Sequence, residues 1–86
     1  MINQDENQVA WVLLCDELKE AREHLVSLET DFAKSDEFDE SEFRVQLGHV
    51  YAHLNRAWNA RSLANGVTDE NWDQMSQFPT DIEPIG

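Results

Sequence analysis

The chain has 86 residues, of which 18 are Asp or Glu and six are Lys or Arg, so its formal net charge is −12 at pH 7. This length corresponds to one small domain, and the charge argues against direct nucleic-acid binding, which needs a basic surface to neutralise phosphates. An anionic membrane surface is disfavoured for the same reason. No apolar run approaches the ~20 residues of a membrane span, and residues 1–8 lack the features of a signal peptide, so we expect a cytoplasmic protein.

Apolar residues recur at alternating spacings of three and four in the first half of the chain. They are Trp11, Leu14, Leu18, Ala21, Leu25, Leu28 and Phe32. This heptad pattern predicts a helix over about 5–34, because no Gly or Pro interrupts residues 1–47. Asn3 or Asp5 is the expected N-cap.

Residues 35–43 break the period and concentrate acidic side chains, so we predict that they form a connection. Asp39, followed by Glu42, resembles a capping box at the start of a second helix over about 40–65. The periodic positions of this helix are Phe43, Leu47, Val50, Leu54, Ala57, Arg61 and Ala64. The Asn65-Gly66 pair provides the left-handed residue that commonly follows a helix.

A short third helix is predicted over about 69–77, with Thr68 as its N-cap. Pro79 and Pro84 prevent continuation, so residues 78–86 are expected to form an extended tail. The sequence therefore predicts one small all-α domain over 1–86, in which a long antiparallel helical hairpin carries a short third helix and a tail.

Two helices touch along one line and cannot enclose a core, so we predict pairing into a four-helix bundle, as a homodimer or with another helical protein. The apolar stripes of both helices are wider than a single contact covers, and pairing is the simplest way to bury them. The residues expected in the core or the interface are Trp11, Leu14, Leu18, Leu25, Leu28, Phe32, Phe43, Leu47, Val50, Leu54 and Trp58.

Four side chains are candidate metal ligands. His49 and His53 are one helical turn apart in the second helix, and Glu20 and His24 have the same spacing in the first. A bundle can bring them together as one carboxylate and three imidazoles, which suits a transition metal. The chain lacks the repeated Glu-x-x-His pairs of di-iron bundles and the HExxH of zinc proteases, so we predict no metal or cofactor and expect these histidines at the edge of the core.

A polar cluster of Asn55, Asn59 and Arg61 stands out in the second helix, because Asn is a poor helix former. We predict a network that fixes the helix register, in which Arg61 pairs with an acid of the first helix or of a second subunit. The alternative is a small pocket or partner site near Trp58 and Trp72.

The sequence contains no recognisable catalytic site. Cys15 has no matched His-Asp arrangement, and three glycines do not form a phosphate-binding loop. We therefore predict a small acidic interaction or oligomerisation module rather than an enzyme. Two alternatives stay open: an acidic mimic of nucleic acid that inhibits a DNA-binding protein, and a metal-binding helical bundle.

Overall fold

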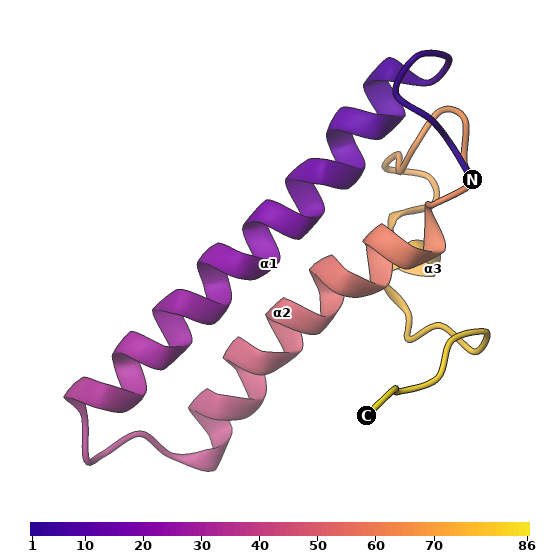
Figure 1. Ribbon diagram of the computed structural model, residues 1–86. Coiled ribbons are helices and arrows are strands. Elements are labelled where there is room, and N and C mark those ends of the chain that lie inside the picture. Colours follow the sequence, from indigo (N-terminus) through magenta and orange to yellow (C-terminus); the bar gives the residue numbers. More distant parts are fainter.

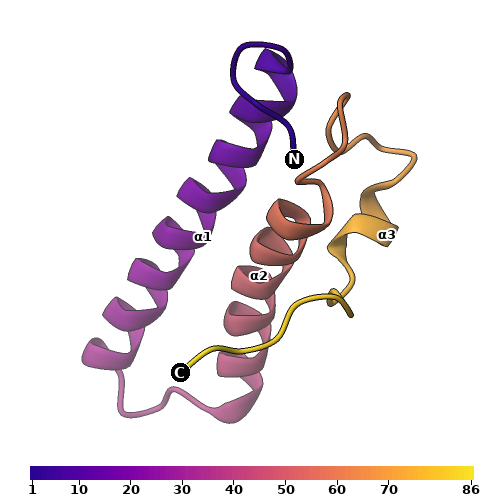
Figure 2. The ribbon, with the colours of Figure 1, turned by 45° about the vertical axis from the view of Figure 1, so that its right-hand side comes forward.

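The computed structural model describes residues 1–86 and contains three helices and no strand. α1 spans Gln8–Lys34, α2 spans Glu40–Asn59 and α3 spans Trp72–Ser76. α1 and α2 form an antiparallel hairpin, and α3 packs on α2 (Figures 1 and 2). The predicted all-α hairpin with a short third helix is therefore confirmed. None of the three helices combines the length and the apolar character that a membrane span needs.

α1 begins three residues later than predicted, because residues 3–6 form a turn of their own. The Asn3 Oδ1 accepts a hydrogen bond from the backbone N–H of Glu6 at 2.8 Å, and the Asn7 Oδ1 accepts one from the backbone N–H of Asn3 at 3.3 Å. Neither Asn3 nor Asp5 is the N-cap, which is Asn7. The side chains at the start of the chain stabilise this turn instead of the helix end.

The N-terminus of α2 agrees with the prediction. The Asp39 Oδ1 accepts a hydrogen bond from the backbone N–H of Glu42 at 2.9 Å, and Asp39 is the N-cap. Two acids in the first turn, Glu40 and Glu42, interact favourably with the positive end of the helix dipole.

α2 ends at Asn59 and not near residue 65, because tight turns replace its last predicted turns. The backbone N–H of Arg61 donates to the Trp58 carbonyl at 3.2 Å, and the Arg61 carbonyl accepts from the N–H of Ile2 at 2.8 Å. Gly66 has φ +72°, and a Cβ there would lie 3.1 Å from Leu13 Cδ1. The predicted left-handed glycine thus closes a turn against α1 rather than ending the helix.

α3 is shorter than predicted, and Thr68 does not cap it. The Asn71 Oδ1 accepts a hydrogen bond from the backbone N–H of Thr68 at 2.7 Å, which holds residues 68–71 in a turn. The helix starts after Asn71, at Trp72, and ends at Ser76.

Small residues form part of the contact line between α1 and α2. Ala10 and Ala21 of α1 and Ala57 of α2 are buried, together with Leu28 and Val50. Small side chains let two helices approach closely, but they bury little apolar area. Only 11 of the 86 residues are buried, so the single chain has a thin core.

The residues predicted for the core or the interface divide into three groups. Leu28 and Val50 are buried within the chain. The half-buried ones are Trp11, Leu14, Leu47 and Trp58. The exposed ones are Leu18, Leu25, Phe32, Phe43 and Leu54. The heptad row of α1 is therefore split, because Leu14, Ala21 and Leu28 are half-buried or buried while Leu18, Leu25 and Phe32 stay exposed.

The C-terminal tail runs along α2, as Figure 2 shows. The Trp58 indole N–H donates to Asp81 Oδ1 at 2.8 Å, and Arg61 Nη2 donates to Asp81 Oδ2 at 3.0 Å. The Phe78 ring packs edge-on against Tyr51, with centroids 5.2 Å apart. The tail is therefore attached to the helix at two places.

We expect Leu28→Ala to lower the free energy of unfolding by about 2–4 kcal/mol, because Leu28 is buried at the hairpin contact. Chemical denaturation followed by circular dichroism measures this change. Ser27→Ala, at an exposed neighbouring position, is the control and should change stability by less than about 0.5 kcal/mol. Similar effects of the two substitutions would contradict the described packing.

The contact of Asp81 with Trp58 and Arg61 should weaken only in acid. The hydrogen bond from the Trp58 indole, and then the one from Arg61, hold the pKa of Asp81 below its ordinary value of 3.8. A depressed pKa in the folded state means that the contact is fully stabilising above pH 4 and is lost as the pH falls through the lowered pKa. We expect the NMR signal of the Trp58 indole proton to keep its shift from pH 7 to 5 and to move below about pH 4. Asp81→Asn should weaken this pH dependence, and an unchanged titration in that variant would contradict the assignment.

Candidate functional site

Arg56 connects the three helices through its buried guanidinium group. Its Nε donates to Glu17 Oε1 of α1 at 3.0 Å, and its Nη1 donates to Ser76 Oγ of α3 at 2.9 Å. The guanidinium carbon lies 4.0 Å from the centroid of the Trp72 ring, in a cation–π contact. The residue is only 4% exposed, so its charge is compensated by Glu17 inside the protein.

His53 lies beside Arg56 and shares the same carboxylate. Its Nδ1 is 2.9 Å from Glu17 Oε2, 3.4 Å from Glu20 Oε2 and 3.1 Å from Arg56 Nη2. The two carboxylates need a donor at Nδ1, whereas the Arg56 guanidinium needs an acceptor there. We assign the ring proton to Nδ1, because the Glu17 oxygen is the nearest of the three groups. The other ring nitrogen, Nε2, is buried and has no hydrogen-bond partner.

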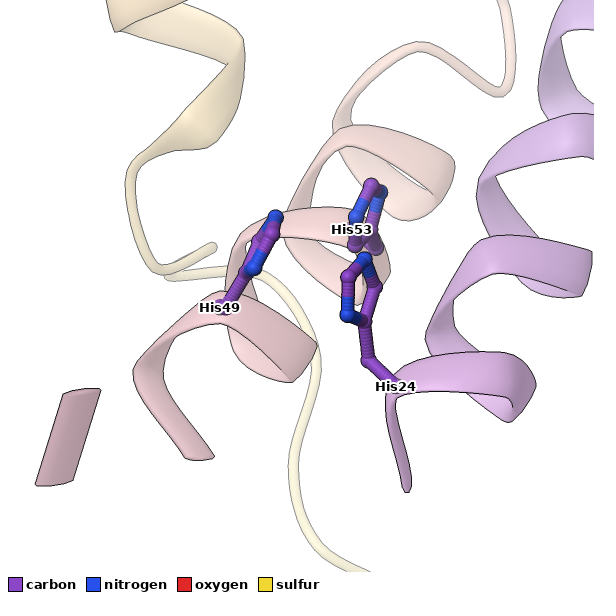
Figure 3. Close-up of side chains that lie close together, drawn as sticks. All are labelled: His24, His49 and His53. Atoms are coloured by element: carbon purple, nitrogen blue, oxygen red, sulfur yellow. The ribbon is translucent and has the colours of Figure 1, made fainter. Parts of the chain in front are cut away.

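The three histidines of the chain meet at the hairpin contact (Figure 3). His24 comes from α1, and His49 and His53 come from successive turns of α2. The ring centroid of His24 is 4.0 Å from that of His49 and 5.1 Å from that of His53. One ring nitrogen from each histidine lies within 4.8 Å of the others. The structure thus brings together three of the four metal-ligand candidates, while Glu20 contacts the Nδ1 side of His53.

The surroundings favour the neutral form of His49. Although the residue is exposed, partial desolvation of its ring lowers the pKa of His49 below 6.5. The neighbouring His24, His53 and Arg56 lower it further, and Glu20 opposes the shift. A neutral imidazole has one nitrogen lone pair available as a hydrogen-bond acceptor or a metal ligand.

The polar cluster fastens the C-terminal part of the chain to α2. Asn55 Nδ2 donates to the Ser76 carbonyl at 2.9 Å, and Asn59 Nδ2 donates to the Met75 and Gln77 carbonyls at 2.7 and 2.8 Å. These bonds satisfy backbone acceptors at the end of α3.

Within the single chain, the partner of Arg61 is Asp81 of the tail and not an acid of the first helix. The guanidinium also lies 3.8 Å from the centroid of the Trp58 ring. The network therefore positions the tail and does not set the register between α1 and α2.

Two hollows border these clusters. A pocket of about 250 Å³ is lined by residues of α1, including Glu17 and Glu20, together with Arg56, Gly66 and Trp72. A groove of about 440 Å³ runs between α2 and the tail, and its apolar lining is formed by Tyr51, Leu54, Trp58, Phe78 and Ile82. Cys15 is exposed and lines neither hollow.

An apolar face occupies one side of the helical hairpin. We use this name for Leu18, Leu25 and Phe32 of α1 together with Phe43 and Leu54 of α2, which are 37–50% exposed. The Phe32 and Phe43 rings have centroids 5.2 Å apart, so the two rows meet on the same side of the hairpin. Seven residues are almost two helical turns, so the α1 row stays on that side.

Sequence reasoning missed the roles of Glu17 and Arg56. A signal was present, because Glu17 and His24 are seven residues apart, which is the spacing of one helical row. In the same way Arg56 follows His53 by three residues. Glu17 and Arg56 are 39 residues apart, so the sequence alone does not show that they form a pair.

We expect Glu17→Gln to lower the free energy of unfolding by about 2–4 kcal/mol, because it leaves the buried Arg56 without its carboxylate. Glu20→Gln is the matched control. The Glu20 side chain is 54% exposed, so this change should cost less than about 0.5 kcal/mol. Urea denaturation of both variants measures the difference, and equal stabilities would contradict the importance of the Glu17–Arg56 pair.

Comparisons of the chain with models of known protein families, with curated proteins and with solved structures found no match.

Proposed function

We propose that the protein is a small acidic oligomerisation module, in which the apolar face of one chain pairs with that of a second copy to form a four-helix bundle. The observation that carries this proposal is that the apolar face consists of large side chains exposed to solvent, while few residues of the single chain are buried. Leu18 and Phe32, for example, are 49% and 50% exposed in the single chain.

The size of the face supports a stable contact. α2 has 20 residues and is about 30 Å long, and two adjacent helices are about 20 Å wide. A face of these dimensions covers about 600 Å² per copy, which is at the lower end of the range for stable interfaces, and the tail borders it at Leu54. The residues buried there would be leucines and phenylalanines, which gain most from leaving water.

The charge of the chain separates this proposal from its alternatives. Two copies of a chain with a net charge of −12 repel one another, so added salt should strengthen the dimer or leave it unchanged. An acidic mimic of nucleic acid would bind a basic partner, and salt would weaken that complex strongly. Salt dependence therefore distinguishes self-association through apolar contacts from binding through charge.

We place this module in the cytoplasm. Cys15 is an exposed free thiol, and such thiols persist in reducing compartments. The single cysteine also means that the chain has no internal disulfide.

Light scattering behind size exclusion, at 50 mM and 500 mM NaCl, tests the proposal. We expect a mass of twice the 10.0 kDa of one chain at both salt concentrations. The double variant Leu18→Gln/Leu25→Gln should weaken dimerisation by at least about 100-fold while the helical circular dichroism spectrum is kept, because each change places a polar group in the interface.

Val45→Gln is the control, since Val45 is 70% exposed on α2 but does not belong to the apolar face. This variant should remain dimeric. A wild-type protein that stays at the mass of one chain at 100 µM, or a double variant that dimerises as well as the control, would contradict the proposal.

A further inference from the structure

We propose that His24, His49 and His53 together bind one divalent transition-metal ion of the zinc class at the contact between α1 and α2. All three ligands come from a single chain, so this site does not depend on the dimer proposed above. The inference rests on the donor set, on one unpaired buried nitrogen and on the group that orients it.

The donor set selects the class of ion. Three imidazole nitrogens suit Zn²⁺, Co²⁺, Ni²⁺ or Cu²⁺, whereas Ca²⁺ and Mg²⁺ require mostly oxygen ligands. His49 and His53 are one turn apart on α2, and His24 approaches them from α1, so one ring nitrogen of each lies within 4.8 Å of the others. Histidine is also uncommon in this chain, and all three copies meet there.

The Nε2 atom of His53 is buried without a hydrogen-bond partner, which indicates that a ligand belongs there. It is buried in a residue that is 96% covered, and no protein group donates a hydrogen bond to it. A buried nitrogen lone pair without a partner costs free energy, because water would otherwise solvate it. A cation held between the three rings would accept that lone pair.

Glu17 orients His53 in the way that metal sites require. Its carboxylate accepts the Nδ1 proton at 2.9 Å, which fixes the tautomer with Nε2 available as a ligand. Carboxylates bound to the outer nitrogen of a metal-ligating histidine are typical of zinc proteins, where they hold the ring in place and increase its basicity. Arg56 in turn holds this carboxylate at 3.0 Å.

Small side-chain movements would complete the geometry. The candidate nitrogens lie within 4.8 Å of one another, whereas nitrogens around a tetrahedral zinc ion are about 3.4 Å apart. The His53 ring is stacked on His24 and on His49, at interplanar angles of 15° and 25°, so the rings must turn to direct one nitrogen each at a common ion. His49 is exposed on its outer side, which leaves room for this rotation. With three protein ligands, a tetrahedral ion keeps one open position for water or another small ligand.

Zinc titration of protein purified without a histidine tag and stripped with a chelator tests the site. By isothermal calorimetry we expect one Zn²⁺ per chain, a dissociation constant of about 1 µM or tighter, and a higher melting temperature in excess Zn²⁺. Co²⁺ should give visible absorption bands of a low-coordinate site with nitrogen ligands.

His49→Gln and His24→Gln should each weaken Zn²⁺ binding by at least about tenfold, because each removes one of three ligands. His49 is exposed, so His49→Gln should keep the fold, which circular dichroism checks. Cys15→Ser is the control for binding to the free thiol and should bind Zn²⁺ like the wild type.

Three results would overturn the proposal: no Zn²⁺ binding tighter than Mg²⁺ binding, equal affinity in the wild type and both histidine variants, or loss of binding in Cys15→Ser. The first result would mean that the acidic surface alone attracts cations. None of these results would affect the mass measurement, so this proposal and the dimer can fail separately.

Discussion

The buried guanidinium of Arg56 is the interaction on which the arrangement of the three helices depends. It reaches Glu17 on α1, Ser76 on α3 and the face of Trp72 from a single position on α2. A buried charge is tolerated only where its hydrogen bonds are made, so each of these partners lowers the free-energy cost of burying the guanidinium. The same carboxylate of Glu17 also binds His53, and therefore one ion pair positions both the short third helix and the histidines.

The small residues along the hairpin contact have an equally broad effect. Ala10, Ala21 and Ala57 allow α1 and α2 to lie close, but the larger side chains of both helices are then directed elsewhere. Some of them, such as Leu28, remain in the contact, whereas Leu18 and Leu25 stay on the outside. A hairpin of this kind resembles one half of a bundle more than a complete domain.

Much of the fold follows from the sequence, because long periodic segments without Gly or Pro are strong helix signals. The end of α2 does not follow from the sequence. The backbone hydrogen bond from Ile2 to Arg61 joins residues far apart in the chain, and it takes the carbonyl that a further helical turn would use. The pattern predicts only part of the surface of α1 that contacts α2. Ala21 and Leu28 of the heptad are in this contact, but the polar row through Glu17 and His24, which also contacts α2, lies outside the heptad. The meeting of the three histidines depends on that polar row.

Because α3 is attached only to α2, it should be less stable than the hairpin of α1 and α2. α3 has no packing contact with α1, and hydrogen bonds from side chains such as Asn55 and Asn59 hold its C-terminal end. Segments held in this way open in local excursions that leave the rest of the fold intact. Amide hydrogens of residues 72–76 should therefore exchange with solvent through a partial opening, well before the hairpin itself unfolds. Such an opening would uncover one side of Arg56 while its bond to Glu17 persists, so α1 and α2 form the more durable unit of this protein.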